Sequence, residues 1–235
     1  MKKFNNQKEP FFHKERILKK KFFIIKMKIE KLNVYINKLY KEKDLLTKEL
    51  YIEKTELKDF IPVIDDDVAR FINIIINLFQ PKKILEIGTS IGYSTTSMAF
   101  NVRKYGGKII TIEYDEKVAK QAKRNFKRAN LLDVIQLIID DALEVIPNLN
   151  EEFDLIFLDV DKQLYPKLFD DCVNILKKGG ILIAEDTLFP VIDLNPKWHY
   201  LIPSIEEFNK LVSSCPKLYS TILPIGDGIT FAVKI

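Results

Sequence analysis

Short apolar runs alternate with helical patterns across the middle of the chain, and this alternation constrains the fold more than any other feature. The apolar runs have the length and the β-branched content of buried strands, and they cover residues 84–87, 108–113, 134–139, 153–158 and 181–184. Helical patterns lie between them, for example over 115–130 and 163–177, where Gly179-Gly180 offers a C-cap to the second helix. This order predicts an α/β fold with a doubly wound, mostly parallel sheet and helices on both faces.

The end of the sequence departs from this alternation. Residues 217–223 and 229–235 are two further strand patterns, and only Pro224–Gly228 separates them. A connection this short suits an antiparallel hairpin rather than a crossover. We therefore expect a sheet of seven strands, mostly parallel, that ends in a C-terminal antiparallel hairpin.

The chain before the first strand has a different character. Residues 1–26 contain nine Lys or Arg and two Asp or Glu, while the whole chain carries a net charge of +4, so the rest is mildly acidic. We predict a basic N-terminal extension at 1–26 and one domain at 27–235, with N-terminal helices at 27–60 and the core at 61–235. The extension can bind nucleic acid or another anionic surface, or can simply be solvated.

Two features bear on the location of the protein. No apolar run approaches the roughly 20 residues that cross a bilayer, and Phe22–Ile25 is also shorter than the about 7–15 residues of a signal-peptide core. Cys172 and Cys215 have neither metal-ligand spacing nor the density of a disulfide framework. We expect free thiols, no membrane segment and a cytoplasmic protein.

The segment from residue 86 to residue 94 is the strongest binding signal. Gly88 and Gly92 lie between a strand and a helix, where glycine lets the backbone turn tightly and approach a ligand. Glu113 ends the next strand, and a carboxylate there can accept hydrogen bonds from both hydroxyls of a ribose. The dinucleotide pattern G-x-G-x-x-G is absent, because the glycines are four apart and Glu86 lies two before the first. This arrangement resembles motif I of S-adenosylmethionine enzymes rather than a nicotinamide site.

From about Phe60 to Ile235 the chain resembles the cation-dependent O-methyltransferases, which include the catechol and caffeoyl-CoA enzymes and bacterial relatives acting on 5-hydroxyuridine in tRNA. The segments that carry the resemblance follow one another in order: 61–64, 84–94, 111–113, 141–142, 157–162 and 224–228. Several ordered matches are more specific than any single one. The resemblance implies the class I methyltransferase Rossmann-like fold and S-adenosyl-L-methionine as the cofactor.

The resemblance also implies which residues bind the cofactor. The set is Ile64, Glu86, Gly88, Ser90, Gly92, Ser94, Glu113, Asp141, Ala142 and Asp159. Within it, Ser94 would hold the methionine carboxylate, Glu113 would bind the ribose, and Asp141 with Ala142 would border the adenine. One departure from the family lies next to this set, where Asp140 replaces the usual glycine.

A divalent cation site is implied as well, formed by Asp159, Asp186 and Thr187 for Mg²⁺ or a similar ion. Oxygen ligands at neighbouring strand ends suit such a cation, which would bind the acceptor hydroxyl and lower its pKa. Lys162 would be the general base, with Asp159 as the second catalytic residue. Thr187 stands where the family usually has asparagine, and a hydroxyl is a poorer ligand, so we expect a weakened site.

The expected function is transfer of a methyl group from S-adenosylmethionine to a hydroxyl of a small aromatic acceptor. One alternative is a tRNA-modifying O-methyltransferase of the hydroxyuridine type, with the basic extension holding the RNA. Another is a cofactor-binding module without catalysis. The resemblance implies a homodimer, for which the helices before Phe60 could supply an interface. Phe189, Trp198 and Tyr200 could line the acceptor pocket or simply pack their loop.

Overall fold

The computed structural model describes residues 34–40, 46–60 and 62–235. Contacts divide the chain into two units, Met1–Leu45 and Leu46–Ile235. Within the first unit only residues 34–40 are described, and they are helical. The predicted basic extension at 1–26 lies outside the described residues, as do 27–33 and 41–45 of the predicted N-terminal helices.

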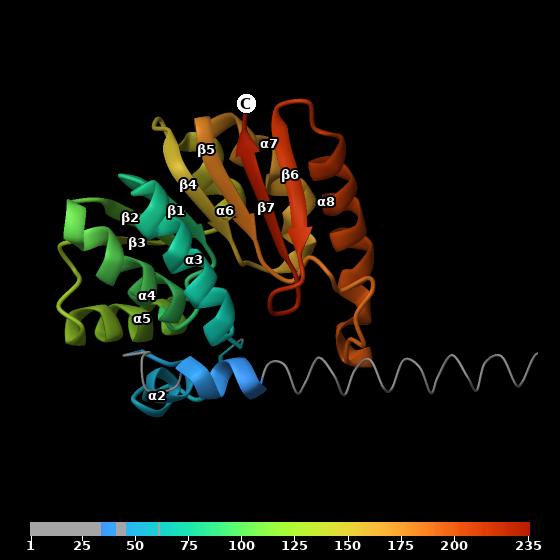
Figure 1. The fold of residues 1–235 in the computed structure, drawn as a ribbon. Coiled ribbons are helices and arrows are strands. Elements are labelled where there is room, and N and C mark those ends of the chain that lie inside the picture. Colours follow the sequence, from blue (N-terminus) through green and yellow to red (C-terminus); the bar gives the residue numbers. More distant parts are fainter. Residues whose placement is uncertain (1–33, 41–45, 61) are drawn as a thin grey trace, which may run out of the picture. The chain divides into compact units, whose positions relative to one another are not determined.

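The second unit is built on one sheet of seven strands in the order β3-β2-β1-β4-β5-β7-β6 (Figure 1). The strands are β1 (Lys83–Ile87), β2 (Lys108–Glu113), β3 (Ile135–Ile139), β4 (Phe153–Leu158), β5 (Leu176–Ala184), β6 (Leu218–Leu223) and β7 (Ile229–Lys234). The first five pair in parallel, whereas β7 pairs antiparallel with both β5 and β6. The predicted seven-stranded sheet with its terminal hairpin is confirmed.

Helices cover both faces of the sheet, as predicted. They are α2 (Lys48–Glu53), α3 (Asp66–Phe79), α4 (Tyr93–Val102), α5 (Glu116–Arg128), α6 (Ala142–Val145), α7 (Tyr165–Ile175) and α8 (Ile202–Ser214). Successive residues of β1 enter two separate cores, because side chains alternate along a strand. Ile84 packs in the core beneath α3 and α4, while Leu85 and Ile87 pack in the core beneath α7 and α8.

Two details of the C-terminal half differ from the sequence prediction. The predicted glycine C-cap is wrong, because α7 ends at Ile175 and the chain passes directly into β5, which contains Gly179 and Gly180. The pairing of β4 with β5 shifts here, from Phe153–Leu176 to Leu155–Ile181, and Gly179 takes a φ of +79°. The glycines therefore serve an irregularity inside a strand. The helix α8 was not predicted at all.

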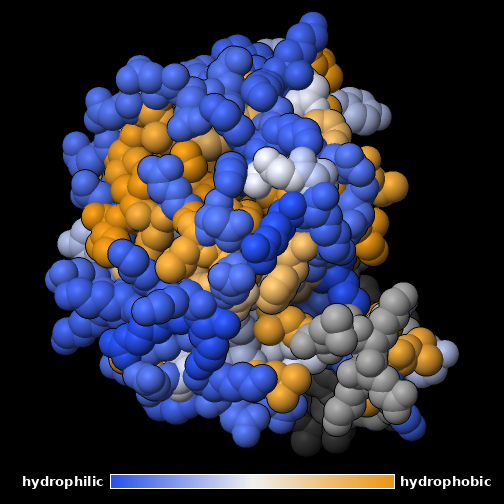
Figure 2. All heavy atoms as spheres, turned by 90° about the vertical axis from the view of Figure 1, so that its left-hand side faces the viewer, coloured by the Kyte–Doolittle hydropathy of each residue, from blue (hydrophilic) through white to orange (hydrophobic). Residues whose placement is uncertain are grey.

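The strand β3 forms one edge of the sheet and is only partly covered. The helix that follows it, α6, has only four residues, so Ile110, Ile138 and Ile139 remain partly exposed. Figure 2 shows the side of the molecule on which β3 lies. Hydrophobic side chains are exposed in the upper half of that view, above a lower part that is mainly hydrophilic.

The described helices include none that is long and apolar enough to span a membrane. Cys172 and Cys215 are free thiols, as predicted. Burial raises the pKa of Cys172 to about 12. A thiol that stays protonated in a core is inert, so Cys172 is a packing residue.

Candidate functional site

The predicted site residues gather at the carboxyl edge of the parallel strands. Gly88 directly follows β1, Glu113 ends β2, Asp159 follows β4 and Asp186 lies two residues after β5. The loop between β6 and β7 lies at this same edge, the lower edge of the sheet in Figure 1, because β7 pairs antiparallel with β5. Parallel strands thus bring together side chains that are far apart in sequence, at the edge where α/β folds bind ligands.

Gly88 and Gly92 are required by the shape of the loop after β1. Their φ angles are +98° and +85°, which disfavour any residue with a Cβ. A Cβ on Gly88 would lie 2.0 Å from the carbonyl oxygen of Asp159, and one on Gly92 would lie 2.4 Å from the ring of Phe126. Gly92 is also the N-cap of α4, whose first amides have no carbonyl partner within the helix. The loop is therefore held tightly and leads directly into the amino end of α4.

Glu113 ties this loop to the end of β2. Its carboxylate accepts hydrogen bonds from the amide of Ser90 at 2.7 Å and from the amide of Asp115 at 3.0 Å. Ser90 has a φ of +50°, so the loop turns toward the carboxylate. Burial raises the pKa of Glu113, while the two amides act in the opposite direction. This half-buried carboxylate thus lies beside the two glycines, and its contact with a ribose stays a prediction.

Glu86 lies beneath the loop and is fully buried. The hydroxyls of Ser94 and Thr111 each donate to it at 2.6 Å, and the hydroxyl of Thr95 donates as well. Burial raises the pKa of Glu86 to about 7, although these hydrogen bonds act to lower it. Its carboxylate contacts the protein itself and adjoins the predicted ligand residue Ser94, so a direct cofactor contact for Glu86 stays a prediction.

Replacing Glu86 by glutamine should remove a pH dependence of stability. The pKa of about 7 exceeds the ordinary value of 4.5, so the folded protein keeps a proton that the unfolded chain releases. The stability linked to this proton is complete below pH 4.5 and is lost as the pH rises through 7. Between pH 4.5 and pH 8, wild type should lose about 3 kcal/mol relative to Glu86→Gln. Urea unfolding at several pH values measures this difference, and a gap that does not change with pH would contradict it.

The remaining predicted cofactor residues surround the same edge. Ile64 is buried directly before the first turn of α3. Asp141 is the N-cap of α6 and accepts from the amide of Leu143 at 2.9 Å, and Ala142 is buried behind it. The amide of Asp140 donates to the carbonyl of Glu113 at 3.0 Å. The ends of β2 and β3 are therefore joined where the adenine is expected.

Three carboxylates form a cluster next to the loop. One ligand oxygen each from Asp159, Glu185 and Asp186 all lie within 4.8 Å of one another. The Nζ atom of Lys162 lies among them, 2.7 Å from Asp159 Oδ1, 3.0 Å from Asp186 Oδ2 and 3.9 Å from Glu185 Oε2. Lys162 begins the short helix η3 (Lys162–Leu164) and is only 7% exposed. The fold brings the predicted Asp159, Lys162 and Asp186 together and adds Glu185.

Burial and the neighbouring charges shift the pKa values of the groups in this cluster. Burial raises the pKa of Glu185 well above its ordinary range and also raises that of Asp159, and the neighbouring carboxylates add to both shifts. Burial alone would lower the pKa of Lys162, but Asp159, Asp186 and Glu185 hold it well above its usual value. The cluster therefore favours additional positive charge, which retained protons or a bound cation can supply.

Glu185 was not among the predicted ligands, while Thr187 as a ligand stays a prediction. Consecutive side chains in a regular strand point to opposite faces, but Asp186 has a φ of +62° and breaks this alternation directly after β5. The carboxylates of Glu185 and Asp186 can therefore both reach the cluster. Thr187 is fully buried, its amide donates to the carbonyl of Gly228 at 3.0 Å, and its hydroxyl has no hydrogen-bond partner among the described residues. The signal available in the sequence was the pair of acids directly after a strand.

The aromatic residues after the cluster have different environments. Phe189 is buried in the core beneath α7 and α8, and Trp198 packs against that core. Tyr200 is 56% exposed, and its ring centroid lies 6.3 Å from that of Trp198. Phe189 therefore packs its loop, and the role of Trp198 and Tyr200 in an acceptor pocket stays a prediction.

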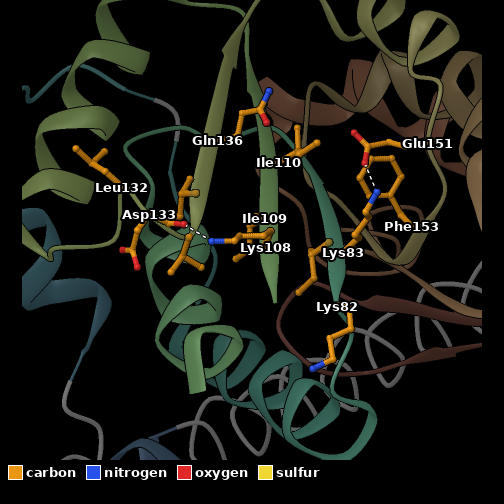
Figure 3. A pocket seen from close by; sticks show the side chains of 13 residues that line it. Lys82, Lys83, Lys108, Ile109, Ile110, Leu132, Asp133, Gln136, Glu151 and Phe153 are labelled. Carbon is orange, nitrogen blue, oxygen red and sulfur yellow. Dashed lines mark hydrogen bonds and ion pairs between the residues drawn. The ribbon is translucent and has the colours of Figure 1, made fainter. Parts of the chain in front are cut away.

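A groove of about 460 Å³ lies at the opposite, amino edge of the strands (Figure 3). Its floor includes Ile110 and Phe153, and lysines at the starts of β1 and β2 border it. Their charges are already engaged: Lys83 pairs with Glu151 at 2.7 Å, and Lys108 donates to the carbonyl of Asp133. The groove is separated from the carboxylate cluster by the length of the strands, so we assign it no part in the chemistry.

Comparison with known proteins agrees with this geometry. The family model described as O-methyltransferase matches residues 37–235. The catechol O-methyltransferase of Niastella koreensis is 33% identical over 176 residues, which cover 70% of this chain and 79% of that protein. Caffeoyl-CoA O-methyltransferase 1 of Eucalyptus globulus is 28% identical over 181 residues, covering 72% and 73% of the two chains.

Solved structures give the same result and bear on the cofactor. The O-methyltransferase of Bacillus cereus in complex with SAH has a TM-score of 0.68 and 25% identity, covering 86% of this chain and 97% of that one. The SAH-bound methyltransferase of Podospora anserina has a TM-score of 0.67 and 26% identity, covering 72% and 78%. The chain belongs to the O-methyltransferase family, and it is an S-adenosylmethionine-dependent O-methyltransferase.

Proposed function

We propose that this enzyme methylates a hydroxyl of a small aromatic acceptor with the help of a divalent cation held by Asp159, Glu185 and Asp186. The observation that carries the proposal is the cluster of three carboxylate oxygens within 4.8 Å of one another. It lies beside the loop of residues 88–92 after β1, called the cofactor loop below. We propose Glu185 rather than Thr187 as the third ligand, because its carboxylate oxygen lies within 4.8 Å of those of Asp159 and Asp186 and is a better ligand than a hydroxyl. The names of the catechol and caffeoyl-CoA relatives support an aromatic hydroxyl as the acceptor.

The donor set fits a hard cation. Carboxylate oxygens are the ligands that Mg²⁺ and Mn²⁺ prefer, and the excess negative charge of the cluster would be balanced by a dication. Bound there, the cation would lower the pKa of the acceptor hydroxyl. Three carboxylates would bind the cation more tightly than two carboxylates and the hydroxyl of Thr187. This ligand set therefore predicts a stronger site than the one expected from the sequence.

The residues of the chain supply the rest of the reaction. Gly88, Gly92 and Glu113 would hold S-adenosylmethionine, which would supply the methyl group, beside the carboxylate cluster. A dication among the carboxylates would lower the pKa of Lys162, which those carboxylates otherwise hold high, and the neutral Nζ beside Asp159 would then take the hydroxyl proton. The acceptor oxygen would then form a bond to the methyl carbon as the carbon–sulfur bond breaks, leaving S-adenosylhomocysteine. Most of the acceleration would come from this positioning.

Removal of divalent cations tests the proposal. Dialysis against EDTA should abolish methyl transfer from labelled S-adenosylmethionine to a catechol such as 3,4-dihydroxybenzoate, and excess Mg²⁺ or Mn²⁺ should restore it. Glu185→Gln should raise the Mg²⁺ concentration needed for half-maximal activity, whereas Thr187→Val should leave it unchanged. Full turnover in EDTA would exclude the cation, and a large shift with Thr187→Val alone would return Thr187 to the ligand set.

A second candidate function, methylation of tRNA, is supported by the surface of α5. Its exposed face carries six basic residues, Lys117, Lys120, Lys123, Arg124, Lys127 and Arg128. Lys120 pairs with Glu116 and Arg124 with Glu56, whereas the other four form no ion pair with any residue that the structure describes. The lower part of Figure 2, on the side where α5 lies, is mainly hydrophilic. A row of basic side chains of this kind matches the phosphate backbone of RNA.

Electrophoretic mobility of a tRNA transcript separates the two candidates. If RNA is the acceptor, Lys123→Glu with Lys127→Glu should weaken tRNA binding more than tenfold and make it less sensitive to salt. The matched control is Lys178→Glu with Lys210→Glu, the same change of charge at exposed residues of β5 and α8. Equal mobility of all three proteins would remove the tRNA candidate and leave the small aromatic acceptor.

A further inference from the structure

The loop that the cofactor is expected to contact has a second surface, which is occupied by α2. Tyr51 is the one buried residue of this helix, and it is 5% exposed. Its hydroxyl lies 2.8 Å from the carbonyl oxygen of Gly92, 3.2 Å from that of Ile91 and 2.8 Å from the hydroxyl of Thr96. Since a tyrosine has one proton, it donates to the nearer carbonyl of Gly92 and accepts from Thr96.

The ring of Tyr51 is fixed as well. It packs against the ring of Tyr93, with centroids 5.5 Å apart, and its backbone carbonyl accepts from the hydroxyl of Thr55 at 2.9 Å. Asn125 of α5 donates both to Thr55 Oγ1 at 3.2 Å and to the carbonyl of Ile91 at 2.9 Å. Two side chains from different helices therefore hold consecutive carbonyls of the same loop.

The start of α2 is anchored independently of the loop. The amide of Lys48 donates to Asp66 Oδ1 at 2.7 Å, and its Nζ pairs with Asp65 Oδ1 at 2.8 Å. The hydroxyl of Tyr93, the first residue of α4, also donates to Asp66 Oδ1. The helix is thus braced against α3 at one end and against the cofactor loop through Tyr51.

We propose that Tyr51 is a positioning residue for S-adenosylmethionine. Its hydroxyl holds the carbonyls of Ile91 and Gly92 on the side of the loop that faces α2, so that the loop is already formed before the cofactor binds. The inference rests on the proposed placement of the cofactor at this loop. Its physical basis is preorganisation: a loop already held in the bound conformation loses less conformational freedom on binding. Burial keeps the pKa of Tyr51 above its ordinary value, so the hydroxyl stays a donor throughout the working pH range.

Calorimetric titration with S-adenosylmethionine tests this role. Tyr51→Phe removes one hydroxyl and should raise the dissociation constant for the cofactor about tenfold, the scale of one lost hydrogen bond. At saturating S-adenosylmethionine, kcat and the KM for a catechol acceptor should stay within twofold of wild type. The matched control is Tyr105→Phe, because the buried hydroxyl of Tyr105 has no partner among the described residues. This variant should bind the cofactor like wild type.

Two comparisons keep the outcomes distinct. A purely structural role would lower the melting temperature of Tyr51→Phe equally with and without cofactor, and would leave the dissociation constant unchanged, which would overturn the proposal. Glu113→Gln removes a carboxylate from the ligand side of the same loop. If Glu113→Gln weakens binding but Tyr51→Phe does not, the positioning role is wrong and the cofactor placement stands. If neither weakens binding, both are wrong.

Discussion

Asp159→Asn should lower kcat/KM by about 100- to 1,000-fold while leaving the fold intact. The change keeps the shape of the side chain but removes one negative charge from the cluster with Glu185 and Asp186, and it weakens the 2.7 Å pairing with Lys162. A weaker cation site and a less well oriented lysine both act on the same proton transfer. Initial rates at saturating Mg²⁺ and S-adenosylmethionine measure the loss, and calorimetry with Mg²⁺ shows whether binding falls with it.

The matched control for Asp159→Asn is Asp161→Asn. Asp161 lies two residues further on, where its side chain is exposed and accepts a hydrogen bond from the amide of Gln163 at 3.0 Å as an N-cap. Asparagine caps helices about as well as aspartate, so this variant should retain near-wild-type kcat/KM. Equal activity of Asp159→Asn and Asp161→Asn would show that the carboxylate cluster takes no part in the reaction.

Gly88→Ala should destabilise the protein by about 3–5 kcal/mol and prevent cofactor binding. The new Cβ would lie 2.0 Å from the carbonyl oxygen of Asp159 and 2.6 Å from its carbonyl carbon, so the backbones of two loops must separate. The φ of +98° adds strain to this overlap. Guanidinium unfolding gives the loss of stability, and calorimetry with S-adenosylmethionine gives the loss of binding.

The control variant Gly179→Ala separates the cost of backbone strain at a positive φ from the cost of steric overlap of the new Cβ. Gly179 also has a positive φ, +79°, but a Cβ there would meet no atom within 4 Å. The variant should therefore lose only about 1 kcal/mol, the cost of the left-handed conformation, and should bind the cofactor normally. If Gly88→Ala proves no less stable than Gly179→Ala, the close approach of the two loops does not constrain the site.

The fold was predictable because it follows from local periodicity. Each strand of the parallel sheet is a short apolar run, and each helix between them buries one face, so the pattern of β1 through β4 can be identified without tertiary contacts. The terminal hairpin was predictable from the five residues that separate β6 from β7. Glycines were harder to interpret, since Gly179-Gly180 looks like a helix cap but lies within β5, where pairing with β4 decided the conformation.

The sequence by itself determined the sheet, the cofactor loop with Gly88 and Gly92, and the acids at the strand ends, because each depends on neighbours in the chain. Only the tertiary structure decided which of these acids meet. The positive φ of Asp186 lets the adjacent Glu185 and Asp186 both reach the cluster, a feature that no periodicity reveals. The contact of Tyr51 with Gly92 is likewise invisible in the sequence, because it joins residues 41 apart through hydrogen bonds that exist only once α2 packs behind the loop.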